Sequence, residues 1–167
     1  MFVVIDDPKH QKNNRSYLLV QDSLKSLQEL AHYHRIKFSI PVIGLTGSNG
    51  KTTTKELVNS VLSQQYKTTS TADNLNNHIG VPLTLLNISS KTQVALIEMG
   101  ANHLEEIAFL CELAQPTLGY ITNFGKAHLE GFGSLEGVIN GKSEIYHFLK
   151  KNKGTALINK EDKKQSN

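Results

Sequence analysis

The sequence has a single cysteine among its 167 residues, so it cannot carry an internal disulfide framework. Cys111 lies in a helical pattern of apolar residues, which favours a small buried side chain over a nucleophile. No apolar run reaches the ~18 residues that a membrane span needs. The first residues, MFVVIDDP, have neither a basic region nor a small-residue cleavage site. These absences predict a soluble, cytoplasmic protein with no membrane partner.

A strong charge of either sign is also missing, since the formal net charge is only +3. The basic residues are scattered, apart from KKNK at 150–153 and the tail, and no aromatic residues are interleaved with them. We therefore expect no nucleic-acid partner. Hydrophobic residues make up 38% of a chain that is long enough for one ordinary domain with a core of its own.

Apolar runs alternate with helical patterns along most of the chain. The expected strands are 2–5, 41–45, 66–69, 94–98, 118–122 and 155–158, and the expected helices are 22–36, 52–65, 81–86, 103–114 and 134–151. This alternation predicts an α/β fold, a mainly parallel sheet with helices on both faces. Ligands of such sheets gather at the carboxyl ends of the strands.

Three finer expectations accompany this pattern. The segment PKHQKNNRS is expected to be a loop, and the tail KKQSN to be disordered. In the helix 52–65, Val58, Val61 and Leu62 are expected to share one apolar side.

The stretch GLTGSNGKTTTKEL, residues 44–57, joins an expected strand to an expected helix. Backbone N–H groups of a glycine-rich turn, together with a helix N-terminus, form an anion site. In a P-loop the lysine adds a point charge for the β- and γ-phosphates, and a threonine hydroxyl can bind Mg²⁺. The candidate nucleotide-binding residues are Gly47, Ser48, Asn49, Gly50, Lys51, Thr52 and Thr53. Leu45 stands where the strict P-loop pattern needs glycine, so an ordinary strand-to-helix turn is the alternative.

Glu98 ends the apolar strand VALIE, at the sheet edge where the glycine-rich loop is also expected. A P-loop enzyme needs an acidic group near its metal, commonly at the end of a neighbouring buried strand. Glu98 is therefore a candidate metal ligand. A solvated carboxylate at the end of a strand is the alternative.

Lys142 conflicts with the apolar pattern of its helix. It lies four residues after Val138 and three before Ile145, which places it on the apolar face. Burial lowers the pKa of a lysine towards neutrality, so a neutral amine that reacts with CO₂ to give a carbamate is one interpretation. A buried stem with a solvated head is the other.

The stretch TNFGKAHLEGFGS follows the expected strand 118–122 and brings Asn123, His128 and Glu130 to the same edge. Histidine is a common metal ligand, so this stretch extends the candidate site.

Four motifs in this order resemble the Mur ligase family. They are TGSNGKTTT, NLNNHIGVPLTLL, LIEMGANHLEEI and TNFGKAHLEGFGSLEG, and the resemblance runs from about residue 22 to 162. It implies an ATP-dependent amide ligase of peptidoglycan precursor synthesis. The branch that resembles this chain most joins D-Ala-D-Ala to a UDP-N-acetylmuramoyl tripeptide through an acyl phosphate.

The resemblance also implies roles for residues. Lys51, His128 and Lys142 would be catalytic. Thr52 and Glu98 would bind one Mg²⁺, and His128 a second, supported by Lys142 as a carbamate. The residues facing the nucleotide and the peptide substrate would be Asn74, Asn77, His78 and Asn123.

Residues 1–39 would then be the end of an N-terminal substrate domain with a linker helix, and 40–167 the first part of the central ATP-binding domain. The rest of the central domain and the C-terminal domain would be absent, so we expect no ligation by this chain alone. Besides this ligase, the alternatives are a non-catalytic ATP-binding module, another Mur-type or folylpolyglutamate-type ligase, and another P-loop enzyme such as a kinase.

Overall fold

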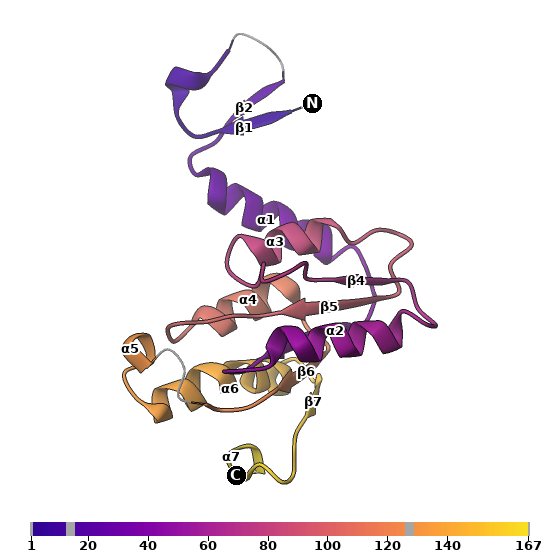
Figure 1. The fold of residues 1–167 in the computed structure, drawn as a ribbon. Helices are drawn as coiled ribbons and strands as arrows, with labels where there is room; N and C mark the ends of the chain where they lie inside the picture. Colours follow the sequence, from indigo (N-terminus) through magenta and orange to yellow (C-terminus); the bar gives the residue numbers. More distant parts are fainter. Residues whose placement is uncertain (1, 13–15, 126–128, 167) are drawn as a thin grey trace.

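The computed structural model describes residues 2–12, 16–125 and 129–166. The strands are β1 Val3–Ile5, β2 Tyr17–Leu19, β3 Val42–Thr46, β4 Thr68–Ser70, β5 Val94–Glu98, β6 Leu118–Ile121 and β7 Thr155–Leu157. The helices are η1 Pro8–His10, α1 Ser23–Arg35, α2 Lys51–Leu62, α3 Gly80–Leu86, α4 Glu106–Ala114, α5 Leu129–Phe132, α6 Leu135–Lys151 and α7 Lys163–Ser166. Figure 1 shows the β1–β2 pair at one end of the molecule and α7 at the other. Within these ranges, no helix has both the length and the apolarity that crossing a membrane requires.

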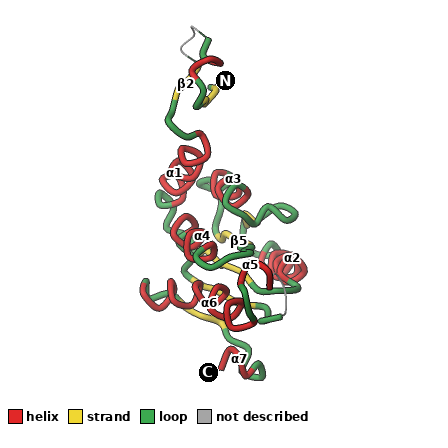
Figure 2. The backbone as a smooth tube through the Cα atoms, turned by 90° about the vertical axis from the view of Figure 1, so that its left-hand side faces the viewer, coloured by secondary structure: helices red, strands yellow, loops and turns green. Residues whose placement is uncertain are grey.

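The main sheet has five parallel strands in the order β4-β5-β3-β6-β7. The helix α2 leads from β3 past β5 to β4, while α4 leads from β5 past β3 to β6, so the chain leaves the centre of the sheet in two directions. Figure 2 shows the consequence, with α2 on one side of the strands and α1, α3, α4 and α6 on the other. The predicted α/β fold with helices on both faces is confirmed. The loop after the central strand β3 therefore lies where such sheets bind ligands.

The core fills the space between the sheet and the larger helical layer. Gly44 of β3 and Gly119 of β6 lie under α6, and a Cβ on either would approach Ile145 to within 2.9–3.0 Å. Close contact with α6 is thus possible because both strands carry glycine there. Val42, Ile97, Ile121, Ile145 and Leu149 are among the buried residues of this core.

Most expected elements are present, and the differences lie in segments without strong periodicity. The segment PKHQKNNRS is not all loop, because η1 forms at Pro8–His10 with its N-cap Asp7. The strand β2, which pairs with β1, was not expected.

The tail was expected to be disordered, and for residues 163–166 this is wrong. Gln165 Nε2 donates to the Ile121 carbonyl at 3.0 Å, and Lys164 Nζ donates to the Phe124 carbonyl at 3.0 Å. These bonds fix α7 at the end of β6, a partner that composition alone does not reveal.

The expected apolar side of α2 is also wrong at one position, since Val61 is 72% exposed. The buried residue of this helix is Lys55, with Val58 and Leu62 half-buried on the same side. Helical spacing of 55, 58 and 62 defines that side. The sequence pattern failed here because a lysine occupies the central buried position.

Candidate functional site

The glycine-rich loop, residues 47–50, joins β3 to α2 and has the backbone conformation that only glycine adopts easily. Gly47 has φ +139° and Gly50 has φ +75°. A Cβ on Gly47 would lie 2.0 Å from Thr122 Oγ1, so no other residue fits there without a shift of Thr122. The turn ends at the N-terminus of α2, whose free N–H groups and dipole favour an anion.

The residues after β6 fix this loop from the side. Ser48 N donates to the Asn123 carbonyl at 3.0 Å, and Asn49 N donates to Asn123 Oδ1 at 3.2 Å. In return, Asn123 Nδ2 and Thr122 Oγ1 both donate to the Asn49 carbonyl, at 2.9 and 2.7 Å. The side chain of Asn123 therefore supports the loop.

Lys51 is the first residue of α2, and its side chain folds back over the loop. Its Nζ donates to the Gly47 carbonyl at 2.9 Å and contacts the Ser48 carbonyl at 3.4 Å. Burial lowers the pKa of Lys51, and the negative charge of Glu98 opposes that effect. The ammonium thus lies directly beside the glycine-rich turn.

Glu98 at the end of β5 is 1% exposed, yet it faces this loop. Its Oε1 accepts from Thr52 Oγ1 at 3.2 Å and from Asn76 Nδ2 at 2.7 Å. Its Oε2 is buried and has no hydrogen-bond partner within the described part of the chain. A buried carboxylate oxygen without a partner is costly, and a bound cation is a common reason for one.

The group around Glu98 therefore fits Mg²⁺, which prefers oxygen ligands and is typically held by one or two protein groups plus substrate phosphates. Among the described residues, no three or more His, Cys, Asp or Glu side chains cluster as a metal site. A site of one carboxylate and one hydroxyl is compatible with that finding. His128, the expected ligand of a second metal ion, lies outside the described residues.

Lys142 of α6 is 1% exposed, so the expectation that it lies on the buried face is confirmed. Its Nζ donates to the Ala101 carbonyl at 3.0 Å and lies 5.2 Å from the centre of the Phe132 ring. Burial lowers the pKa of Lys142 to about 8, and the charge of Lys51 adds to this effect. A substantial fraction of the amine is neutral near that pH, as reaction with CO₂ requires.

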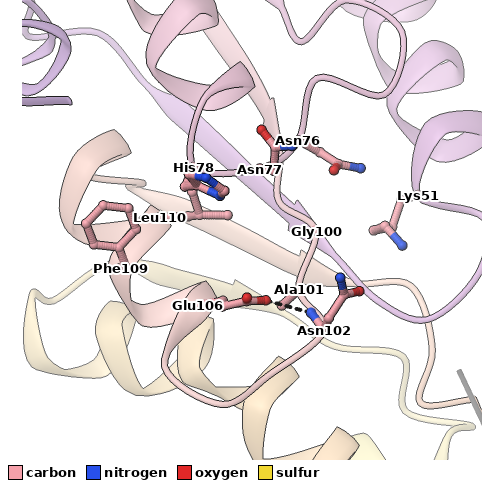
Figure 3. A pocket seen from close by; sticks show the side chains of 10 residues that line it. All are labelled: Lys51, Asn76, Asn77, His78, Gly100, Ala101, Asn102, Glu106, Phe109 and Leu110. Carbon is pink, nitrogen blue, oxygen red and sulfur yellow. Dashed lines mark hydrogen bonds between the residues drawn. The ribbon is translucent and has the colours of Figure 1, made fainter. Parts of the chain in front are cut away.

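A cavity of about 390 Å³ opens beside Lys51 (Figure 3). It is lined by Lys51, Asn76, Asn77, His78, Gly100, Ala101, Asn102, Glu106, Phe109 and Leu110. One part of this lining carries amides and the lysine, and another part is apolar. Lys142 is connected to this lining by its hydrogen bond to the carbonyl of Ala101.

The predicted substrate-facing residues differ in position. Asn77 and His78 line the cavity, and Asn77 Oδ1 also accepts from the backbone N–H groups of Ile79 and Gly80 at the start of α3. Asn74 is exposed and is not among the lining residues. Asn76 was not predicted, although it is the asparagine that contacts Glu98. The run NLNN gave no means of choosing between its three asparagines.

The comparisons with known proteins agree with one another. The sequence profile of the Mur ligase middle domain matches residues 45–167. The UDP-N-acetylmuramoyl-tripeptide–D-alanyl-D-alanine ligase of Bacillus subtilis is 45% identical over 137 residues, 82% of this chain and 30% of that protein. The ligase of the same name from Escherichia coli is 46% identical over 142 residues, 85% of this chain and 31% of that protein.

Solved structures give the same result. MurF from Acinetobacter baumannii superposes with a TM-score of 0.87 at 38% identity, covering 98% of this chain and 36% of that one. MurF ligase from Thermotoga maritima in complex with ADP superposes with a TM-score of 0.82 at 34% identity, covering 96% and 38%. The chain thus spans about a third of the length of the relatives it matches.

Proposed function

Because the chain belongs to the Mur ligase family, we propose that it is the phosphate-holding part of an ATP-dependent amide ligase. The substrates we propose for the whole enzyme are ATP, a UDP-N-acetylmuramoyl tripeptide and D-Ala-D-Ala, in a cytoplasmic step of peptidoglycan precursor synthesis. The names of the relatives at 45–46% identity support this choice of substrates. The ADP complex of the Thermotoga maritima relative supports the nucleotide.

The observation that carries the proposal is the convergence of Lys51, Glu98 and the cavity at one edge of the sheet. The turn 47–50 offers backbone N–H groups to phosphate oxygens, and Lys51 would leave its two carbonyls to contact the β- and γ-phosphates. Glu98 Oε2 and Thr52 Oγ1 would hold Mg²⁺, which neutralises the charge on those phosphates.

The cavity next to Lys51 is where we place the peptide carboxylate that accepts the phosphoryl group. Asn76, Asn77 and Asn102 offer amides that can orient a peptide end, and the partly buried cation of Lys51 favours the approach of a carboxylate. The chain's contribution is to hold these groups in place and to balance their charge.

Lys142 has a separate proposed role. Its neutral amine would take up CO₂, and the resulting carbamate would be an anionic ligand beside the phosphate site. Its burial and its position beneath Ala101 support this role. We also propose His128 as a metal ligand, from its place in the sequence alone.

The domain assignment is also a proposal. Residues 1–39 would be the end of a substrate domain with the linker helix α1, and 40–167 the first part of the ATP-binding domain.

Calorimetric titration of Mg-ATP into the 167-residue chain tests the phosphate site. We expect binding that Lys51→Ala abolishes and that Lys91→Ala, at an exposed lysine, leaves unchanged. Equal affinity for the wild type and Lys51→Ala would refute the assignment of the loop. Absence of binding in all three would contradict a phosphate site in this chain by itself.

A further inference from the structure

Lys55 is a fully buried lysine on α2, one turn after the partly buried Lys51, and the function proposed above does not use it. It is fully buried, with 0% of its surface exposed. Its Nζ donates to the Thr71 carbonyl at 2.6 Å and to the Asp73 carbonyl at 3.2 Å. It also forms an ion pair with Glu56 Oε1 at 2.7 Å. All three contacts lie at the junction of α2 with the segment that follows β4.

A buried ammonium is an expensive way to fill space under a helix. Desolvation of a charge costs several kcal/mol, and an apolar side chain of similar volume is often equal or better for stability. Lys55 also occupies the position where the sheet-facing side of α2 calls for an apolar residue. Unlike an apolar side chain, the ammonium donates hydrogen bonds to two backbone carbonyls of the segment 71–78.

That segment needs an anchor of this kind. It has neither helix nor strand between β4 and α3, and it passes through Asp73, a non-glycine residue with φ +45°. A non-glycine residue with positive φ is uncommon, and aspartate is one of the types that adopts this conformation most often. The two carbonyls that Lys55 binds lie on either side of residue 72, where the chain turns.

From these carbonyls, a short path of hydrogen bonds leads to the site. Thr71 Oγ1 accepts from the backbone N–H of Glu98 at 2.9 Å. Further along the segment, Asn76 Nδ2 donates to Glu98 Oε1 at 2.7 Å, and the Asn76 carbonyl accepts from Gly100 N at 2.7 Å. Asn76, Asn77 and His78 then form part of the lining of the cavity in Figure 3.

We propose that Lys55 is a positioning residue that locks the segment 71–78 to the phosphate-loop helix. Through this contact, two parts of the site keep a fixed position relative to Lys51, which lies on the same helix as Lys55. They are the cavity wall that carries Asn76, Asn77 and His78, and the carboxylate of Glu98. The lock itself follows from contacts within the chain, whereas its use in ligation rests on the proposed function.

Amide hydrogen exchange of the nucleotide-free chain tests the lock directly. In Lys55→Met, which keeps the volume and removes the charge, we expect the amides of residues 71–78 and of Gly100 to exchange about tenfold faster or more. The amides of β3, β6 and α6 should keep their protection. The matched control is Glu56→Gln, which removes the exposed carboxylate that pairs with Lys55. In this variant, the exchange rates of the same amides should change by no more than about twofold.

Two exchange results would overturn the proposal. One is unchanged exchange in 71–78, and the other is an equal rise over the whole sheet, which would indicate a purely structural role. If Lys55→Met does not fold by circular dichroism, Lys55→Gln replaces it, since it retains an N–H donor. Failure of both variants to fold also counts against a positioning role.

The second readout is the gain in ATP affinity on adding Mg²⁺. In EDTA, we expect Lys55→Met to bind ATP with the same affinity as the wild type, because Lys51 and its loop belong to α2 itself. The gain in affinity on adding Mg²⁺ should be about tenfold smaller in Lys55→Met than in the wild type. Equal gains in the two proteins would contradict the link between Lys55 and Glu98. If the wild type binds no ATP, the proposed function fails, while the exchange experiment still decides the lock.

Discussion

Lys51, Lys55 and Lys142 each donate a hydrogen bond from the ammonium group to a backbone carbonyl near the candidate site. The carbonyls belong to Gly47, to Thr71 and to Ala101. All three carbonyls lie in segments that leave the carboxyl ends of β3, β4 and β5, which are neighbouring strands. These ammonium groups therefore lie at the edge of the sheet where we propose that phosphates bind. The carboxylate of Glu56 pairs with Lys55, and the negative charge of Glu98 acts on Lys51.

The lowered pKa of Lys142 makes its contribution to stability depend on pH. The unfolded lysine has a pKa near 10.5 and the folded one about 8, so between these values the unfolded state binds more protons and stability rises with pH. The cost of burying the ammonium is fully present below about pH 8. Lys142→Met should therefore be more stable than the wild type at pH 7 in buffer free of bicarbonate.

Urea unfolding at pH 7 and 9.5 measures this effect. We expect the advantage of Lys142→Met to shrink by about 2 kcal/mol between the two pH values. Lys150→Met, at an exposed position of the same helix, is the control and should show no such trend. An advantage that is constant with pH would mean that the lysine stays charged in the fold.

At the scale of elements, α1 is fixed to the α4 side of the sheet by a buried arginine. Arg35 is 5% exposed, and its guanidinium donates to the carbonyls of Ala114, Phe38 and Gln115 at 2.9, 2.7 and 3.1 Å. Two of these carbonyls lie at the C-terminus of α4, where a cation is favourable. Burial lowers the pKa of Arg35, and the acceptors of these three bonds are carbonyl oxygens rather than carboxylates.

Arg35→Met should destabilise the chain by about 2–4 kcal/mol, because one buried and two partly buried carbonyls lose their donor. Arg35→Lys should recover only part of this, since an ammonium cannot donate to three carbonyls in the same fork-like geometry. Lys37→Met, which removes a cation near the exposed Tyr33 ring, is the control with a change of at most about 0.5 kcal/mol. Chemical denaturation gives all three values, and equal stability of Arg35→Met and the wild type would contradict this anchoring.

The packing of α5 on α6 depends on two glycines of α6. A Cβ on Gly137 would lie 2.0 Å from the Phe132 carbonyl oxygen, and a Cβ on Gly141 would lie 2.4 Å from the Phe132 ring. The Phe132 ring in turn covers the Lys142 ammonium. Glycine inside this helix, which costs about 1 kcal/mol relative to alanine, is thus explained by the neighbour it admits.

Gly137→Ala should therefore destabilise the chain by about 1–3 kcal/mol despite its better helix propensity, because the backbone of α5 has to move. Asn140→Ala, at an exposed position of the same helix, should be neutral or slightly stabilising. Thermal unfolding of the two variants compares them directly. A stabilising Gly137→Ala would mean that α5 does not pack on α6 as described.

At the scale of the whole molecule, the two faces of the sheet are covered unequally. The helix α2 lies over β3, β4 and β5. On β6 and β7, at the other end of the sheet, Leu118 and Tyr120 are only half-buried and Leu157 is 52% exposed. Gly119 points under α6, so its neighbours Leu118 and Tyr120 point to the side of α2. This apolar area remains open beside α2.

We expect no ligation by this chain alone, because it spans about a third of the ligases it resembles. A coupled phosphate-release assay with ATP, UDP-N-acetylmuramoyl tripeptide and D-Ala-D-Ala should give no turnover. The full-length Bacillus subtilis relative serves as the positive control. Turnover by the 167-residue chain would refute this expectation.

The sequence by itself determined the order of the elements and the place of the glycine-rich loop. Apolar runs alternating with helical patterns predicted the five strands of the main sheet, and TGSNGKTTT predicted a phosphate loop between β3 and α2. Asp22 and Ser134 cap α1 and α6 through their own side chains. These are local properties, in which a residue's preference is decided within a few positions.

Only the tertiary structure decided which polar residues meet. Periodicity placed Lys142 on a buried face, but it could not show that Lys55 is buried too. The reason is that the carbonyl that Lys55 binds belongs to Thr71, sixteen residues further along the chain. It could not choose Asn76 over Asn74 as the partner of Glu98, since a run of asparagines carries no period. Strand order brings 46–52, 71–78, 98–102 and 121–125 to one edge, and that order follows from the packing of helices on the two faces of the sheet.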